Sequence, residues 1–181
     1  PGIFEISHEE EDEESAIADI LEATEEALDN FDAMRETEGK EISKDILKCG
    51  DSIESLAGIL EEKAPEIQAL YMEGLKNRIS ELLGEESGIA EERIVVEAAI
   101  MADKSSINEE IVRLKSHVVQ LKRIISKEGG PAGKKLDFLA QEMNREANTI
   151  ASKAGDLSVT EVSLSLKSEI EKIREQVQNL E

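Results

Sequence analysis

The sequence predicts an all-α fold: a long helical hairpin or arm, followed by a C-terminal helical bundle. Apolar residues recur at three- and four-residue steps through most of the 181 residues, the period of an amphipathic helix. The aromatic content is low, with three Phe, one Tyr and no Trp, so aliphatic side chains and Met must fill the core. We divide the chain into a linker or remnant strand of a missing N-terminal domain (1–11), a long acidic helical arm (12–90) and a C-terminal helical domain (91–181).

The arm is predicted to contain one or two long helices. One apolar register runs from Ile17 to Met34, and a second runs from Ile42 to Leu82. Pro65 lies inside the second register and should kink the helix, because proline lacks the backbone N–H and clashes with the preceding turn. Gly84 and Gly88 should end it.

The C-terminal domain is predicted to contain four helices, of which the first is short. A helix over about 91–102 is followed by Ser106–Glu109, which has the pattern of a capping box and should open the next helix. Glycines and Pro131 within 128–133 mark a loop, and the next helix covers 133–154. Ser158–Glu161 repeats the capping-box pattern and should begin the last helix.

Charge is distributed unevenly along the chain. The net charge is −21, which opposes binding to a polyanion. Residues 1–38 contain fifteen acidic side chains and one basic side chain, whereas residues 104–135 contain eight Lys or Arg and three Glu. The basic segment is therefore where we expect phosphate contacts. A charged face that only solubilises a helix is the alternative.

Several classes of protein are not indicated by the composition. Cys49 is the single cysteine, so no internal disulfide forms, and with two His it cannot complete a clustered zinc site. No run of eighteen apolar residues predicts a membrane span. We therefore expect a cytoplasmic protein with no membrane partner.

The helix over 133–154 has unusual polar side chains beside its apolar stripe. Asp137, Gln141, Asn144 and Asn148 line one strip, and Glu142, Arg145, Glu146, Thr149 and Ser152 crowd the next. Asn and Thr lower helix propensity, which indicates that this side is occupied. The occupant is either a ligand from outside the fold or a structural partner, such as a neighbouring helix or a subunit interface.

Four blocks of sequence resemble the YicC family of bacterial proteins. The most specific block is GKKLDFLAQEMNREANT at 133–149, continued by Ser152 and Lys153. The other blocks are EEIVRLKSHVVQLKRI (109–124), KIREQVQNLE (172–181), and PGIFE (1–5) with NFDAMRETEG (30–39). Family members also carry an N-terminal domain of about a hundred residues, so we expect this chain, which starts at Pro1, to be the central and C-terminal part of a longer protein.

The resemblance implies an endoribonuclease that assembles as an oligomeric ring, a hexamer in the best-described members, and uses a divalent cation. The expected function is cleavage of single-stranded RNA, with Mg²⁺ or Mn²⁺ as the cofactor and no DNA partner. The alternative is a non-catalytic helical oligomerisation or adaptor module, whose acidic arm docks on another protein.

Two kinds of residue are candidates for catalysis. Glu142 and Glu146 stand one helical turn apart and are suited to share a hard cation, although carboxylates at this spacing are also common on solvated helices. His117 lies one turn after Arg113 and is suited to proton transfer while the arginine holds a phosphate; its structural alternative is an interface or capping role.

The candidate RNA-binding residues come from the same two helices and the loop between them. Arg145 has a structural alternative, an ion cluster with Glu142 and Glu146. All four aromatic residues fall on or near apolar stripes or the domain junction, so no stacking platform for bases is predicted. The complete predicted set is Arg113, Lys134, Lys135, Asn144, Arg145, Asn148 and Lys153.

Overall fold

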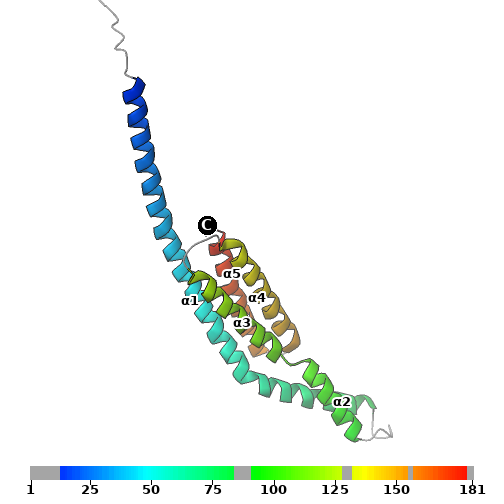
Figure 1. The fold of residues 1–181 in the computed structure, drawn as a ribbon. Helices are drawn as coiled ribbons and strands as arrows, with labels where there is room; N and C mark the ends of the chain where they lie inside the picture. The colour runs from blue at the N-terminus through cyan, green and yellow to red at the C-terminus, as the bar shows by residue number, and fades with distance from the viewer. Residues whose placement is uncertain (1–12, 84–90, 128–131, 155–156, 179–181) are drawn as a thin grey trace, which may run out of the picture. The chain divides into compact units, whose positions relative to one another are not determined.

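The computed structural model describes residues 13–83, 91–127, 132–154 and 157–178. These ranges contain five α-helices and no strand, which confirms the all-α prediction (Figure 1). The predicted linker at 1–11 lies outside the described residues. No helix among the described residues is long and apolar enough to cross a membrane. The helices are α1 (Glu13–Leu83), α2 (Glu91–Lys104), α3 (Asn108–Ile125), α4 (Gly133–Ala154) and α5 (Leu157–Val177).

The chain divides into two compact units, residues 1–41 and 42–181. In the first unit, the described residues form the N-terminal part of α1, and the apolar side chains of the predicted stripe are exposed by about half or more. Arg35 places its guanidinium 5.5 Å from the centre of the Phe31 ring. This unit thus has the predicted amphipathic pattern, but its described residues bury no core of their own.

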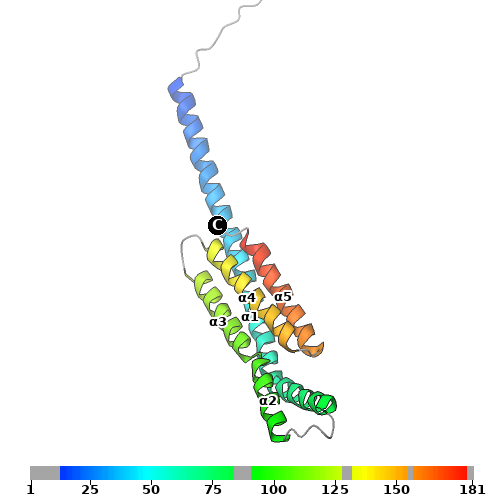
Figure 2. The same ribbon diagram turned by 90° about the vertical axis from the view of Figure 1, so that its right-hand side faces the viewer.

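The second unit holds the hydrophobic core. Four helical segments contribute to it: α3, α4, α5 and the part of α1 that begins at Ile42 (Figure 2). Aliphatic side chains and Met143 fill this core, as the low aromatic content requires. The largest fully buried side chains are Ile46, Ile53, Leu60, Ile111, Leu114, Leu121, Leu136, Met143, Ile150, Leu166, Ile170 and Ile173.

Helix α1 continues through Pro65 instead of ending there. Within the second unit its axis changes direction between the part that packs on the other helices and its C-terminal part (Figure 1). A proline inside a helix produces this result because it removes one hydrogen bond and displaces the carbonyl one turn earlier. The described part of the helix runs to Leu83, and the stop predicted at Gly84 and Gly88 lies outside the described residues.

Both predicted capping boxes of the second unit are wrong in detail. Helix α3 begins at Asn108, Ser106 Oγ accepts a 3.4 Å bond from the Asn108 N–H, and Glu109 pairs with Arg113 instead of reaching back. Helix α5 begins at Leu157, one residue before the predicted cap, and Ser158 Oγ accepts a bond from Lys63 Nζ on α1. Ser106 thus keeps a local bond to the start of α3, whereas Glu109 pairs within its own helix and Ser158 also contacts α1.

Candidate functional site

An open hollow of about 330 Å³ lies between α3 and α4. Helix α3 contributes Arg113, Ser116 and His117, and α4 contributes Glu142, Arg145 and Glu146. The structure therefore brings together all three predicted catalytic residues and two of the predicted RNA-binding residues. Only Ser116 was not predicted, and a serine on a polar helix face gives no signal by which the sequence would single it out.

Helical spacing explains why these side chains share one hollow. In α3, Arg113 and His117 are four residues apart and occupy the flank beside the buried Leu114 and Val118. In α4, Glu142 and Glu146 have the same spacing and occupy the flank beside the buried core residues. Packing the two apolar stripes together places the two polar flanks side by side.

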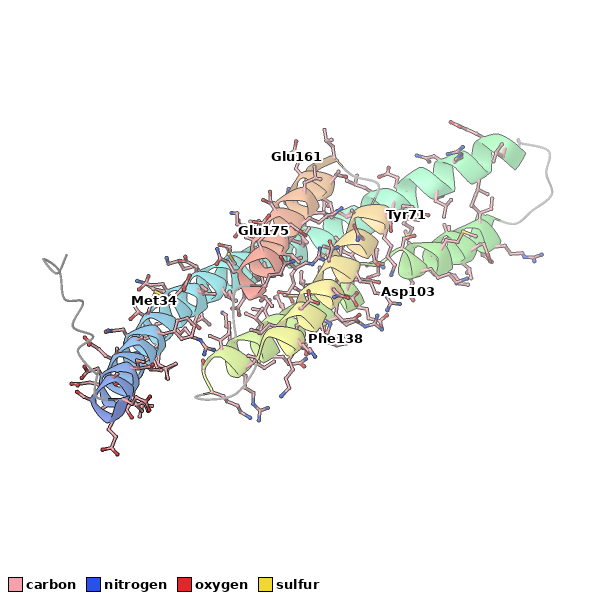
Figure 3. The ribbon with its side chains drawn as sticks, turned by 90° about the horizontal axis from the view of Figure 1, so that it is seen from above. Met34, Tyr71, Asp103, Phe138, Glu161 and Glu175 are labelled. Atoms are coloured by element: carbon pink, nitrogen blue, oxygen red, sulfur yellow. The ribbon has the colours of Figure 1, made fainter. Side chains whose placement is uncertain are left out.

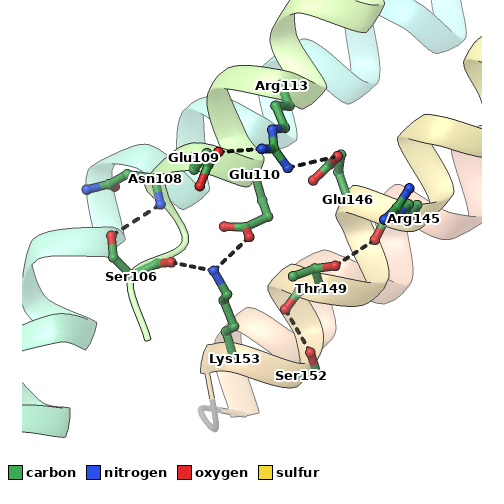
Figure 4. A network of polar contacts seen from close by, with 10 residues as sticks. All are labelled: Ser106, Asn108, Glu109, Glu110, Arg113, Arg145, Glu146, Thr149, Ser152 and Lys153. Carbon is green, nitrogen blue, oxygen red and sulfur yellow. Dashed lines mark hydrogen bonds and ion pairs between the residues drawn. The ribbon is translucent and has the colours of Figure 1, made fainter. Parts of the chain in front are cut away.

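Glu146 is the most buried charged group of the hollow, with 5% of its surface exposed. Its Oε1 lies 3.8 Å from Arg113 Nη1, an ion pair that is longer than a hydrogen bond (Figure 4). Arg113 also pairs with Glu109 one turn earlier in α3. Arg113 thus has two carboxylate neighbours, while Arg145, on the other wall, is exposed. The hollow combines two guanidinium groups with two carboxylates.

His117 is half-buried, and its Nδ1 is enclosed without a hydrogen-bond partner among the described residues. A buried polar atom of this kind costs free energy unless a ligand, water or another group satisfies it. The predicted alternative role in capping receives no support from this geometry, because the ring lies in the wall of the hollow rather than at a helix end.

Lys153 lies at one end of the α3–α4 seam, in a structural network. Its Nζ donates a 2.7 Å bond to Glu110 and a 3.1 Å bond to the Ser106 carbonyl (Figure 4). Glu110 is 4% exposed, and its second oxygen is buried without a partner. A buried carboxylate requires a cation of this kind. The structure therefore gives Lys153 a role in stability, apart from the hollow.

Lys134 and Lys135 are exposed at the beginning of α4 and do not line the hollow. They precede Glu142 by seven or eight residues, which is about 11 Å along a helix axis. Neither ammonium group has an ion-pair partner in the described part of the chain. They are open to a ligand, but only to one that extends beyond the hollow.

Asn144 and Asn148 lie on a different flank of α4 from Glu142 and Glu146, because two residues turn a helix by about 200°. On that flank Asp137 lies 4.0 Å from Arg174 of α5 and accepts a 2.7 Å bond from Gln141. The two polar strips predicted for this helix thus border different neighbours. The hollow receives only the strip that contains the acids and Arg145.

Part of the predicted basic segment is engaged within the fold. Lys122 of α3 lies 2.6 Å from both Asp51 and Glu54 of α1, and Lys115 pairs with Glu61. The hydrogen bonds to Asp51 and then Glu54 raise the pKa of the Lys122 ammonium. The acidic residues of α1 that face α3 were the signal for this pairing, but the sequence does not show which helices are neighbours.

Among the described residues, the side chains of the hollow do not by themselves complete a divalent-cation site. Glu142 and Glu146 supply two carboxylates, and Glu146 already faces Arg113. No group of three or more His, Cys, Asp or Glu residues is arranged to hold a metal within the described ranges. A hard cation needs more oxygen ligands than the two carboxylates supply.

A second hollow, of about 650 Å³, lies between α1 and α5. Its walls contain four serines, Leu56, Asp51 and Glu169, and no cationic side chain. Both carboxylates are already paired with lysines that do not line the hollow, Asp51 with Lys122 and Glu169 with Lys172, so the lining offers no free cation to a phosphate. The smaller hollow is therefore the better candidate for an anionic ligand, despite its size.

Two family models match separate ranges of the chain. The family model described as "Endoribonuclease YicC-like, C-terminal" matches residues 60–181, and the model of the N-terminal region matches residues 1–44. Part of that N-terminal region is thus present, where the sequence predicted only a linker and the start of the arm. The hollow lies wholly within the C-terminal match.

Two curated relatives match the whole chain. A protein of Clostridioides difficile (strain 630) named "Probable endoribonuclease YicC" is 47% identical over 181 residues. A protein of Haemophilus influenzae with the same name is 35% identical over 181 residues. The chain spans 61% of the length of each of these relatives.

Proposed function

Because the chain belongs to the YicC-like endoribonuclease family, we propose that it is the helical part of an endoribonuclease that cleaves single-stranded RNA. The observation that carries this proposal is the hollow between α3 and α4. It gathers a histidine, two arginines and two carboxylates from parts of the sequence about 25 residues or more apart. This is the set of groups that proton transfer at a phosphodiester requires.

Each residue of the hollow has a proposed role. Arg113 and Arg145 hold the phosphate, since guanidinium groups bind its oxygens through several N–H donors. His117 takes the proton of the ribose 2′-hydroxyl. Glu146 orients Arg113 through their ion pair, and Glu142 contacts the ribose hydroxyl region from the opposite wall.

The proposed reaction forms one bond and breaks one bond at phosphorus. The 2′-oxygen attacks as His117 removes its proton, the bond to the 5′-oxygen breaks, and solvent protonates that oxygen. The products are a 2′,3′-cyclic phosphate and a 5′-hydroxyl. DNA lacks the 2′-hydroxyl and is therefore not a substrate. The alternative route uses the divalent cation that the family resemblance implies; Glu142 and Glu146, one helical turn apart, would then supply two of the oxygen ligands of Mg²⁺ or Mn²⁺.

The test is cleavage of a labelled single-stranded RNA by the full-length protein, with and without EDTA. We expect Glu142→Gln and Glu146→Gln to abolish cleavage without unfolding the chain. Glu161→Gln is the matched control, because Glu161 is an exposed acid of α5 outside the hollow (Figure 3). Normal cleavage by both hollow variants would refute the proposed roles.

Product analysis and the chelator separate the two routes. Cyclic phosphate ends formed in EDTA support the His117 route, and complete loss of cleavage in EDTA, restored by Mg²⁺ or Mn²⁺, supports the cation route. Native mass measurement on the same protein tests the proposed homo-oligomer. An assembly that neither binds nor cleaves RNA at low salt would instead favour the adaptor interpretation.

A further inference from the structure

We propose that Phe138 is a stacking platform for an unpaired base of the RNA, next to the cleaved linkage. This proposal rests on the proposed function, because it assumes that RNA occupies the hollow between α3 and α4. It names a binding residue outside that hollow and a reason why the substrate must be single-stranded.

The first observation is the exposure of the ring. Phe138 lies between the core residues Leu136 and Leu139, yet 60% of its surface is exposed (Figure 3). The sequence placed Phe138 on or near an apolar stripe and predicted no stacking platform; the structure places the ring outside the buried stripe. Because isolated apolar residues are common on protein surfaces, the exposure shows that the ring is accessible, and its place beside the hollow carries the argument.

The second observation is the place of the ring on α4. Phe138 is four residues before Glu142, so the two side chains are offset by about 6 Å along the helix and about 40° around it. Glu142 lines the hollow, and Phe138 lies one turn before it on the exposed side of α4. A nucleotide whose phosphate contacts Arg145 in the hollow has its neighbouring base within reach of this ring.

The third observation is the charge on the far side of the ring. Lys134 and Lys135 lie about one turn before Phe138, and both are exposed. Along this flank the chain thus presents lysines, then an aromatic ring, then the hollow with its arginines. A single strand matches this order, because it presents negative phosphates with apolar base faces between them.

Stacking explains a preference for single strands without sequence readout. Every base has a flat face that stacks on an aromatic ring, and pairing in a duplex covers these faces with neighbouring base pairs. We therefore expect Phe138 to favour unpaired RNA of any sequence. A second copy of the chain packing on Phe138 is the competing occupant, and the experiment distinguishes the two.

The test uses the full chain with two RNA probes. One is a fluorescein-labelled single-stranded RNA read by anisotropy, and the other contains 2-aminopurine, whose fluorescence falls when it stacks. We expect Phe138→Leu to weaken binding by between about fivefold and about a hundredfold and to abolish the quenching. Phe138→Tyr keeps the ring and should keep both properties.

Phe31→Leu is the matched control, because Phe31 is also exposed but lies in the first unit, remote in sequence from the hollow. It should leave binding and quenching unchanged. Unchanged binding and quenching in Phe138→Leu would overturn the proposal. The same result with an altered native mass would identify the ring as a contact between subunits, and would also overturn it.

The outcome separates this inference from the proposed function. If Phe138→Leu behaves as the parent chain while His117→Ala loses cleavage, the stacking proposal fails and the proposed function stands. If the parent protein neither binds nor cleaves RNA, both fail. A raised KM with little change in kcat for Phe138→Leu supports both, since stacking acts on binding rather than on proton transfer.

Discussion

The two flanks of α3 use the same kind of side chain in opposite ways. On one flank, Lys115 and Lys122 pair with carboxylates of α1 and hold two helices of the second unit together. On the other flank, Arg113 and His117 line an open hollow beside the buried carboxylate of Glu146. The Nδ1 atom of His117 has no hydrogen-bond partner among the described residues. The lysines of one flank are paired within the fold, whereas the other flank lines the hollow that we propose as the RNA site.

The comparison shows that the basic residues of segment 104–135 do not share one role. Cations opposite the acidic face of α1 are neutralised, so they contribute little to the binding of a polyanion. Toward α4, Arg113 faces a wall that contains the exposed Arg145 as well as two acids, and Arg145 is the cation on which the proposed phosphate site chiefly relies. The net charge of −21 therefore does not decide what this hollow binds.

The largest expected difference between the flanks is in cleavage. His117→Ala should lower the rate by about 10²- to 10⁴-fold, the usual contribution of a general base. Lys115→Met, two residues away on the other flank, should cleave RNA at nearly the parent rate. Initial rates on a labelled RNA, with circular dichroism as the check on folding, measure both. Equal rates in the two variants would remove the distinction between the flanks.

The next effect is on stability, at the end of the seam where Lys153 pairs with Glu110. Lys153→Met leaves a carboxylate that is 4% exposed without its cation, which should cost about 3 kcal/mol in the free energy of unfolding. Glu110→Gln combined with Lys153→Met removes both charges and should recover much of that loss. Urea unfolding measures each. A loss no greater than that of Lys167→Met, an exposed control on α5, would contradict the network.

The helices and most of their bounds could be predicted from the sequence, because helical periodicity is local. The apolar stripes of 111–125 and 136–150 predicted the buried faces correctly, and spacing placed Arg113 with His117 and Glu142 with Glu146. The predicted caps at Ser106 and Ser158 were wrong in position, because α3 begins two residues after Ser106 and α5 begins one residue before Ser158. The exact first residue of a helix is the least local part of the pattern.

What sequence could not supply was the choice of neighbours. Nothing local distinguishes Lys122, which contacts α1, from Arg113, which faces α4, or predicts that Asn144 does not line the hollow. The exposure of Phe138 was missed for the same reason, since an aromatic residue between two core leucines resembles a core residue. Pairing across helices depends on packing angles that no single-helix pattern contains.

A smaller stability effect is expected inside the hollow. Glu146→Gln substitutes a neutral group of the same shape for a buried carboxylate. The arginine partner of that carboxylate, Arg113, is 3.8 Å away. We expect the free energy of unfolding to stay the same or rise by up to about 1 kcal/mol, because functional groups are often held at a cost in stability. Urea unfolding beside the cleavage assay measures both properties. A loss of several kcal/mol would make Glu146 a structural residue like Glu110.

The smallest effect is expected on the satisfied flank. Lys122→Met should lower the free energy of unfolding by less than about 1 kcal/mol, because its partners Asp51 and Glu54 are largely exposed. The folded-state pKa of Lys122 is raised above its ordinary 10.5, so its contribution is complete below that pH and is lost as pH rises through the folded value. The difference in unfolding free energy between Lys122→Met and the parent chain should therefore be constant near neutral pH, disappear in strong alkali, and shrink in 1 M salt.

Urea unfolding at several pH values and salt concentrations, with Lys167→Met as the control, checks each trend. A salt-independent difference would mean that the methylene stem of Lys122 acts through packing against α1 rather than through its charge.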